Sequence, residues 1–460
     1  MTRALYSLLM WLGQPLLRRK LMRRGKLEAG YHQHVEERFG RYDAETIVAA
    51  GDFVWVHAVS LGETRAAELL IGRLRERLPG LRLLLTHSTA TGRAEGLKLL
   101  RPDDRQVWLP WDTPGAVQRF LGRYRPRLGV LMETELWPNL SAACARHAVP
   151  LVMVNARLSE KSLRQARRMG WLARPAYRSL TAVWAQTEDD ARRLASMGAP
   201  VKAVLGNLKF DATPDAAKLA QGRAWRAAQA MPVVVLAVSR EGEEAALLAL
   251  LADKGANGAA SAAVQWLIVP RHPQRFDAVA ALIEQHGFKL SRRSTWSAAA
   301  GPATAAPPAV GFCAASAAAP ISGPASADDG GACLIWLGDS LGEMALYYGL
   351  ADVALLGGSF EPLGGQNLIE AAGCGCPIVM GPHTFNFAQA AQLAQARGAA
   401  LRVDDMAAAL QCAPALAHNA QELAQRQQAA LQFAQAHGGA LDRTCDALLE
   451  LLGQQRVDRP

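Results

Sequence analysis

Short apolar runs alternate with longer stretches of helical pattern over most of the chain. A first series lies at residues 54–59, 81–86, 107–109, 128–132, 151–155, 182–185 and 201–205. A second series lies at residues 233–237, 266–269, 334–337, 353–356, 378–380 and 399–403. Runs of this length between helical stretches are typical of strands buried on both faces of a parallel sheet. The pattern therefore predicts an α/β protein with two such sheets.

Domain boundaries follow from this pattern and from the length of 460 residues, which exceeds one ordinary hydrophobic core. We assign the first domain to residues 27–215, a polar, alanine-rich linker to 216–230, the second domain to 231–440 and a polar tail to 441–460. Two similar halves joined by one linker predict a cleft at the carboxyl ends of both sheets, where such folds bind ligands.

Residues 297–331 interrupt the second domain with a run of Ala, Gly, Pro and Ser. The run has too few large apolar residues to pack, so we predict a disordered insertion in a surface loop. Residues 254–263 form a smaller stretch of the same kind.

The amino-terminal segment is the part of the sequence most like a membrane segment. Residues 4–17 carry no charge and are short for a spanning helix. A basic cluster follows at once, which is the wrong side for a cleaved signal. We interpret residues 1–26 as a membrane anchor with a basic patch, either spanning or lying in the interface of an anionic leaflet. The alternative is a helix that docks on the first domain.

Charge and cysteine content narrow the partners and the compartment. The formal net charge of +9 favours an anionic partner, which could be nucleic acid, phospholipid or a phosphorylated substrate. The seven cysteines show no metal-ligand spacing and no disulfide framework, which fits a reducing compartment.

Polar residues that follow strands of the first domain are the candidate chemical groups. Glu63 falls at the start of a helix after the first strand and could deprotonate a hydroxyl, although it could also be an ordinary helix-start glutamate. Of the two carboxylates Glu133 and Glu135, we favour Glu133 as the site residue. Arg157 and Lys209 also follow strands and could meet an anion, or could be solvated charges.

The second domain carries a glycine-rich stretch at residues 357–387 that predicts a nucleotide site. Its glycine pairs let backbone N–H groups face a ligand, and a helix should begin near Asn367 with Glu370 one turn in. Arg271 ends another strand, and residues 338–343 open a further helix. A glycine-rich connection without a ligand is the alternative. The sequence contains no GxGxxG fingerprint, P-loop or metal cluster, so a metal-independent transfer without a cofactor is expected.

The motifs resemble a known family. They read HAVSLGE, LPWDTPGAVQRFL, METELWPN, VNARLS, GNLKFD, VPRHPQRF, LGDSLGEM and GGQNLIEAAGCGCPIVMGPHTFNF. Together, and in this order, they resemble the 3-deoxy-D-manno-octulosonic acid (Kdo) transferases of lipopolysaccharide synthesis. The resemblance extends from the amino terminus to about residue 390.

The resemblance implies a GT-B glycosyltransferase fold, with two Rossmann-like domains facing across a cleft and an amino-terminal membrane anchor. It implies transfer of Kdo from CMP-Kdo to a lipid A precursor, lipid IVA, at the cytoplasmic face of the inner membrane. The implied partners are therefore CMP-Kdo, the lipid precursor and inner-membrane phospholipid, and not nucleic acid.

The resemblance also assigns roles to residues. It implies that Glu63 is the general base of an inverting displacement and that Glu133 and Lys209 stabilise the transition state. The residues implied to hold CMP are Pro270, Arg271, Leu341, Gly342, Glu343, Asn367, Leu368, Ile369 and Glu370.

The sequence departs from the family pattern at three points, and two other functions are kept as alternatives. Gln366 stands where many members have His, residues 239–241 read Ser-Arg-Glu, and the insertion has no counterpart in compact members. A GT-B glycosyltransferase with a different nucleotide-sugar donor is the main alternative. A membrane-bound binding protein without catalysis is another, and intact Glu63, Glu133 and Lys209 argue against it.

Overall fold

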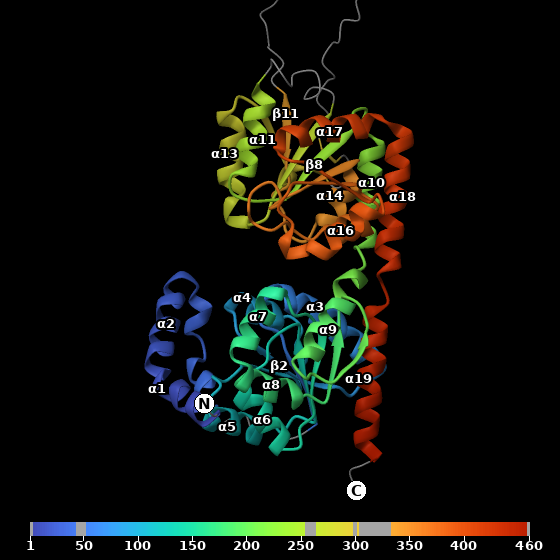
Figure 1. Ribbon diagram of the computed structural model, residues 1–460. Coiled ribbons are helices and arrows are strands. Elements are labelled where there is room, and N and C mark those ends of the chain that lie inside the picture. Colours follow the sequence, from blue (N-terminus) through green and yellow to red (C-terminus); the bar gives the residue numbers. More distant parts are fainter. Residues whose placement is uncertain (1–2, 43–51, 254–263, 298–300, 303–332, 458–460) are drawn as a thin grey trace, which may run out of the picture. The chain divides into compact units, whose positions relative to one another are not determined.

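The computed structural model describes residues 3–42, 52–253, 264–297, 301–302 and 333–457. The chain divides into two compact units. Unit 1 comprises Met1–Asp211 and His437–Pro460, and unit 2 comprises Ala212–Ala436. Figure 1 shows a strand-and-helix architecture in each unit.

Unit 1 is built on a seven-stranded parallel sheet with the order β3-β2-β1-β4-β5-β6-β7. Its strands are β1 (Phe53–His57), β2 (Arg82–His87), β3 (Arg105–Trp108), β4 (Leu128–Met132), β5 (Leu151–Ala156), β6 (Ala182–Ala185) and β7 (Val201–Val204). The strand order reverses between β1 and β4, so loops after these neighbouring strands leave in opposite directions. Such a switch point is where open α/β sheets bind ligands.

Helices cover both faces of this sheet (Figure 1). They are α3 (Leu61–Arg77), α4 (Ala90–Leu97), α5 (Pro114–Tyr124), α6 (Pro138–Arg146), α7 (Glu160–Arg168), α8 (Gly170–Arg178), α9 (Glu188–Ser196) and α19 (Ala440–Val457), with short 3-10 helices at η1 (Ala29–His32), η2 (Val35–Phe39) and η3 (Leu208–Asp211). Successive side chains of β1 enter different cores: Trp55 packs with Phe120, whereas Val56 packs with Leu70. This alternation is the expected geometry of a strand buried on both faces.

The amino-terminal segment packs on unit 1 as two helices, α1 (Arg3–Leu12) and α2 (Gln14–Leu27). The Tyr6 hydroxyl donates to Asp112 at 3.0 Å, and Ser7 Oγ donates to Asn139 at 2.9 Å. Leu21 joins a small core with Trp108. The amino-terminal segment therefore docks on the first domain, as the alternative interpretation predicted, because polar and apolar contacts hold it there.

A spanning anchor is not supported. Within the described ranges, no helix combines the length and the apolar character that crossing a membrane requires. The helical segment is interrupted at Gly13, between α1 and α2. Each of the two helices is therefore much shorter than a bilayer core is thick. Several large apolar side chains of this segment nevertheless stay exposed: Leu8, Leu9, Trp11, Leu12, Leu16 and Met22.

Unit 2 is built on a second seven-stranded parallel sheet with the order β10-β11-β9-β8-β12-β13-β14. Its strands are β8 (Val233–Ser239), β9 (Gln265–Pro270), β10 (Lys289–Arg292), β11 (Leu334–Leu337), β12 (Val353–Leu356), β13 (Ile378–Met380) and β14 (Ala400–Arg402). Its helices are α10 (Ala216–Ala227), α11 (Glu243–Ala252), α13 (Phe276–Gln285), α14 (Met344–Leu350), α15 (Leu368–Gly373), α16 (Ala388–Ala396), α17 (Met406–His418) and α18 (Ala420–Ala436), with 3-10 turns η4 (Pro273–Arg275), η5 (Arg293–Thr295) and η6 (Phe385–Phe387). The order reverses between β8 and β12, which again marks a switch point.

Two assigned boundaries differ from the structure. Residues 216–230, interpreted as a linker, largely form α10, which packs against α14 so closely that a Cβ at Gly222 would lie 2.1 Å from the Leu346 carbonyl oxygen. Residues 441–460, interpreted as a tail beyond the second domain, largely form α19 of unit 1. Leu448 of α19 is fully buried in the unit 1 core, so apolar burial returns this segment to the first domain (Figure 1).

The strand predictions differ from the structure mainly at their ends. β4, β6, β11, β12 and β13 have the predicted bounds. β10 was not predicted, because its sequence Lys-Leu-Ser-Arg is polar and lies at the sheet edge. The predicted insertion at 297–331 and the stretch at 254–263 lie outside the described residues, apart from Ser297, Gly301 and Pro302.

Candidate functional site

In unit 1, the predicted catalytic residues follow strands whose carboxyl ends share one edge of the sheet. Glu63 follows β1, Glu133 directly follows β4, and Arg157 directly follows β5. These three strands are neighbours in the sheet, and β1 and β4 flank the switch point. Lys209 lies in η3, which follows β7. The topology therefore gathers side chains that are far apart in the sequence.

Glu63 occupies the third position of α3 in a capping arrangement with Ser60. The Ser60 side chain accepts from the Glu63 backbone N–H at 3.4 Å. The Glu63 carboxylate in turn accepts from Val59 N–H at 2.8 Å and from Ser60 Oγ at 3.1 Å. This reciprocal pattern fixes the carboxylate at the helix start. The sequence spacing Ser-x-x-Glu is its local cause.

The environment of Glu63 tunes it toward proton transfer. Burial raises the pKa of Glu63 from 4.5 to about 7, and the negative charge of Glu133 adds to this, while the bond from Val59 acts in the opposite direction. A carboxyl group with a pKa near neutrality can take a proton and is a stronger base than an ordinary glutamate. The Glu63 side chain can therefore both cap α3 and accept a proton.

Glu133 holds two cations at the same edge. Its Oε1 accepts from Lys209 Nζ at 2.9 Å, and its Oε2 lies 3.8 Å from Arg157 Nη1. Glu133 is buried and has a φ of 58°, a left-handed conformation that is uncommon for a residue with a side chain. Strain of this kind persists where the surrounding structure enforces it, often at functional sites. The structure thus brings together Glu63, Glu133 and Lys209.

Other residues position Lys209, and the sequence reasoning did not single them out. Asn155 Oδ1 accepts from Leu208 N–H at 3.1 Å, and Asn207 Oδ1 accepts from Lys209 N–H at 3.0 Å. Asp211 accepts from the backbone N–H groups of Gly439 and Leu441 where α19 begins. The only sequence signal was the position of these residues in segments that follow strands. The carboxyl-terminal helix therefore braces the segment that carries Lys209.

His57 is a packed residue. It is fully buried, its Nδ1 lies 2.9 Å from Thr86 Oγ1, and burial lowers its pKa to about 3. The ring is therefore neutral and supports the end of β1.

In unit 2, the three segments implied to hold CMP also share one edge of a sheet. Pro270 ends β9 and Arg271 follows it, residues 341–343 follow β11, and residues 367–370 follow β12. β9, β8 and β12 are consecutive in the sheet. Arg271 is held by its backbone N–H, which donates to Ser239 O at 3.0 Å.

The residues of the second segment differ in what they present. Leu341 is exposed, and the Gly342 carbonyl accepts from Lys218 Nζ at 2.9 Å. Glu343 pairs with Arg293 at 2.9 Å. The Gly342 carbonyl and the Glu343 carboxylate thus already have protein partners. Their roles toward a nucleotide stay predictions.

The third segment begins a short helix. Asn367 Oδ1 accepts from Ile369 N–H at 3.2 Å and caps α15. Leu368 and Ile369 are buried in the protein, so their side chains serve packing. Glu370 lies one turn in and is half-buried. Asn367 and Glu370 are therefore the members of this segment whose side chains are polar and accessible in part.

A buried carboxylate that sequence reasoning missed organises the edge of unit 2. Glu243 accepts from the backbone N–H groups of Arg240 at 2.9 Å, Gly358 at 2.8 Å and Phe360 at 3.1 Å. It thereby ties the loop after β8 to the glycine-rich loop after β12. Its position in the sequence Glu-Gly-Glu-Glu after a strand was the available signal.

Two of the departures from the family pattern lie together at this point. A Cβ at Gly358 would lie 3.2 Å from Gln366 Nε2 and 3.6 Å from Arg240 Cγ. Gly358 has a φ of 71°, which also favours glycine. Burial and the charges of Arg240 and Arg271 lower the pKa of His272. Cations thus gather at this edge of unit 2, where Arg240 pairs with Glu241 and Arg275 pairs with Glu244. Over the described part of the chain, His, Cys, Asp and Glu form no group that could hold a metal ion.

Known structures identify the class of this fold. A glycosyltransferase crystal structure from Rickettsia africae aligns with a TM-score of 0.52 at 12% sequence identity, covering 87% of this chain and 99% of that chain. Two parallel α/β units with this likeness define the GT-B fold.

Sequence relatives identify the family within this class. The model of the 3-deoxy-D-manno-octulosonic-acid transferase (kdotransferase) family matches residues 33–212. The 3-deoxy-D-manno-octulosonic acid transferase of Bordetella pertussis is 44% identical, covering 98% of this chain and 100% of the relative. The protein of the same name from Haemophilus influenzae is 30% identical, covering 97% of this chain and 98% of the relative. The chain belongs to the Kdo transferase family of enzymes.

Proposed function

We propose that this Kdo transferase moves Kdo from CMP-Kdo to a sugar hydroxyl of a lipid A precursor, lipid IVA, by direct displacement with inversion. The observation that carries the mechanism is the Glu63 carboxylate. It is held by Val59 and Ser60 at the switch point of the unit 1 sheet, and its pKa is raised to about 7.

The reaction requires a base because a sugar hydroxyl is protonated at neutral pH. In the proposed step, the acceptor oxygen bonds to the anomeric carbon of Kdo while the bond from that carbon to the CMP phosphate breaks. The hydroxyl proton passes to Glu63, and the electron pair of the broken bond leaves with CMP. A raised carboxyl pKa favours proton uptake in this step.

Lys209 is proposed to stabilise negative charge that develops at the reacting centre. Its ammonium group is oriented by Glu133 and by the η3 turn, so little reorganisation is needed when charge develops. Glu133 is proposed to act by ordering Lys209 and Arg157. Glu133 pairs with both cations, and this supports a role in ordering them rather than a role as a second general base.

Unit 2 is proposed to bind CMP through Pro270, Arg271, Leu341–Glu343 and Asn367–Glu370. Arg271 would meet the phosphate as a forked donor, and Asn367 and Glu370 offer polar groups to the nucleoside. The gathering of Arg240, Arg271 and His272 at the edge of the sheet supports this assignment. No divalent ion is required in this proposal, because protein cations meet the phosphate charge.

We also propose that the enzyme works at the cytoplasmic face of the inner membrane, with α1 and α2 lying in the interface. Exposed Leu8, Leu9 and Trp11 would enter the acyl boundary. The basic residues of α2 would meet anionic phospholipid headgroups. A short interfacial helix needs less apolar length than a spanning one.

The test of the proposed reaction is product analysis with purified full-length protein. CMP-Kdo, UDP-sugars and GDP-sugars are each incubated with a tetra-acylated disaccharide bisphosphate, and the product is measured by mass spectrometry. We expect a mass increase of Kdo with CMP-Kdo alone. Transfer from a UDP- or GDP-sugar would favour the alternative GT-B function. Binding of CMP-Kdo without turnover would indicate a binding protein.

A further inference from the structure

Unit 1 contains a cavity of about 480 Å³ that the proposed reaction does not use. Its walls are the loop 134–138 after β4, helices α7 and α8, and Tyr6 of α1. The wall is somewhat more apolar than polar, and its apolar members include Leu136, Trp137, Leu158, Met169, Leu172 and Tyr177. A cavity of this size and lining is typical of small-molecule sites.

The cavity adjoins the residues of the candidate catalytic edge. Its lining begins at Thr134, the residue after Glu133, and includes Glu135. Burial is the main cause of the raised pKa of Glu63, and the charge of Glu135 adds to it after that of Glu133. Glu135 therefore belongs both to the cavity and to the surroundings of Glu63. Its position links the cavity to the proposed site of the acceptor hydroxyl.

Large apolar side chains are exposed at the rim of the cavity. Met169 is 44% exposed and Trp171 nearby is 40% exposed, which is unusual for large apolar side chains. The exposed cations of α7 and α8 lie outside the lining: Lys161, Arg164, Arg167, Arg168 and Arg174. A hollow with these apolar walls, open to solvent at Met169, is complementary to an alkyl chain. A free nucleotide or sugar would leave most of the apolar lining unused.

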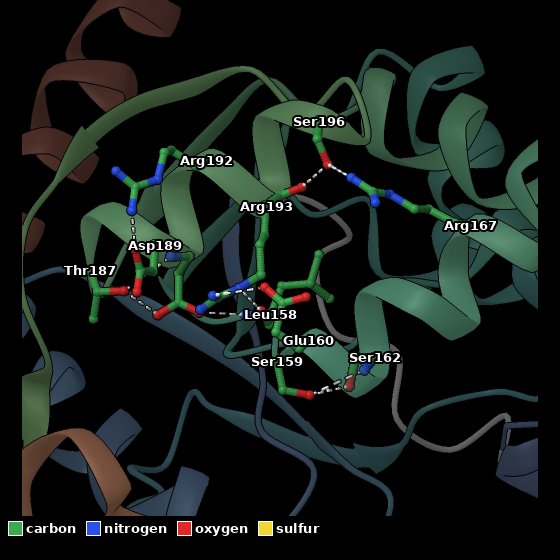
Figure 2. Close-up of polar contacts among 11 residues, drawn as sticks. Leu158, Ser159, Glu160, Ser162, Arg167, Thr187, Asp189, Arg192, Arg193 and Ser196 are labelled. Carbon is green, nitrogen blue, oxygen red and sulfur yellow. Dashed lines mark hydrogen bonds and ion pairs between the residues drawn. The ribbon is translucent and has the colours of Figure 1, made fainter.

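The wall formed by α7 is held in place by polar contacts to α9, drawn in Figure 2. Leu158 N–H donates to Asp190 at 2.8 Å, and the Leu158 carbonyl accepts from Arg193. Ser159 caps α7 by accepting from Ser162 N–H at 3.1 Å (Figure 2). These bonds fix the start of α7 in place. A ligand that binds a preformed cavity pays a smaller entropic cost of ordering the protein.

We infer that this cavity holds one acyl chain of the lipid acceptor while the acceptor's sugar hydroxyl meets Glu63. The inference rests on the proposed function and deepens it, because it assigns the acceptor's apolar part to named walls of unit 1. In this arrangement the acyl chain lies along the 134–138 loop and between α7 and α8. Acylation of the acceptor thereby contributes to binding and to positioning of the hydroxyl.

Filling the cavity tests this inference. Ala166→Phe on α7 and Ala173→Phe on α8 add bulk to lining positions, and both alanines are half-buried rather than core residues. The matched control is Ala195→Phe on α9, an exposed position that is not part of the lining. Each protein is assayed in one detergent with a tetra-acylated disaccharide bisphosphate and with the same compound after deacylation.

We expect KM for the acylated acceptor to rise at least tenfold in both filled variants, while kcat/KM for the deacylated acceptor stays at the parental value. The control should match the parent with both acceptors. An unchanged KM for the acylated acceptor in the filled variants would overturn the inference, as would a parent that uses both acceptors equally well. Loss of vesicle binding with unchanged KM in detergent would also overturn it and would indicate phospholipid as the occupant.

Photolabelling of the unmodified protein avoids dependence on the folding of the variants. A tetra-acylated acceptor with a diazirine in one acyl chain should label peptides from residues 134–138 and 160–178. Labelling confined to other segments would refute the assignment. A parent that is labelled there but transfers no Kdo would instead remove the proposed reaction, so the two failures are distinguishable.

Discussion

Replacing Glu63 by Gln should abolish most activity and, at alkaline pH, stabilise the protein. Glutamine keeps the length of the side chain and an oxygen that can accept from Val59 N–H. It also serves in a capping box as well as glutamate does, so the start of α3 is preserved. The substitution therefore removes a buried charge and a base while leaving the local hydrogen bonds in place.

The magnitude follows from the pKa of Glu63, which burial raises from its ordinary 4.5 to about 7. A carboxyl group with a raised folded pKa binds its proton more tightly in the folded protein. Stability is therefore unaffected by this group below the unfolded pKa, falls as the pH rises from 4.5 to 7, and is lowest above 7. At about 1.4 kcal/mol per pH unit, the full cost of the ionised side chain is about 3 kcal/mol.

The assay is calorimetric unfolding of the parent and of Glu63→Gln at pH 5 and pH 8.5. We expect the variant to be more stable by about 3 kcal/mol at pH 8.5 and by much less at pH 5. Turnover should fall by about 10² to 10⁴, the usual effect of losing a general base. Glu68→Gln, an exposed position on the same helix, is the control for the charge change and should alter neither quantity.

The result that refutes the reasoning is a stability difference that does not grow with pH, because the carboxylate would then carry no burial cost. Turnover near the parental value would separately show that Glu63 is not the base. Loss of CMP binding would mean that Glu63 acts through the structure of the domain.

Three further predictions address other parts of the molecule. The kcat/KM of the parent should fall about tenfold per pH unit below pH 7, because Glu63 must be ionised to accept a proton; a profile flat to pH 5 would contradict this. Lys209→Ala should lower turnover by about 10² to 10³ with unchanged CMP affinity measured by calorimetry, because Lys209 lies in unit 1. Leu9→Glu with Trp11→Glu should reduce co-sedimentation with anionic vesicles and leave turnover on a deacylated acceptor unchanged.

A last prediction is that the reaction does not depend on a metal ion. Turnover should persist in EDTA, because protein cations are proposed to meet the donor phosphate. Inhibition by EDTA that a divalent ion reverses would show that an ion takes part.

Local pattern determined most of the sheet. Runs such as those of β4 and β12 are apolar, short and bounded by helical stretches, and burial on both faces of a parallel strand requires such a run. The same local logic located Glu63, because it follows an apolar strand and falls where a helix begins. β10 lacked the signal because an edge strand can be polar.

The family was also visible in the sequence, because its motifs are long and ordered along the chain. The motifs placed Glu133 and Lys209 in segments after strands, yet their 2.9 Å ion pair depends on strand order and on the left-handed conformation at Glu133. Likewise, the position of Glu243 after a strand marked it as a candidate, but its hydrogen bonds from Gly358 and Phe360 depend on β8 and β12 being neighbours in the sheet.

Only the tertiary structure decided where the chain ends belong. α19 has the polar composition of a tail, but its Cys445 and Leu448 are buried in the core of unit 1. In addition, Asp211 accepts hydrogen bonds from the Gly439 and Leu441 backbone N–H groups where the helix begins. The amino-terminal segment likewise has the composition of an anchor, but Tyr6 and Leu21 are held by the domain. The physical reason is that periodicity and capping act over a few residues, whereas these contacts join segments that folding alone brings together.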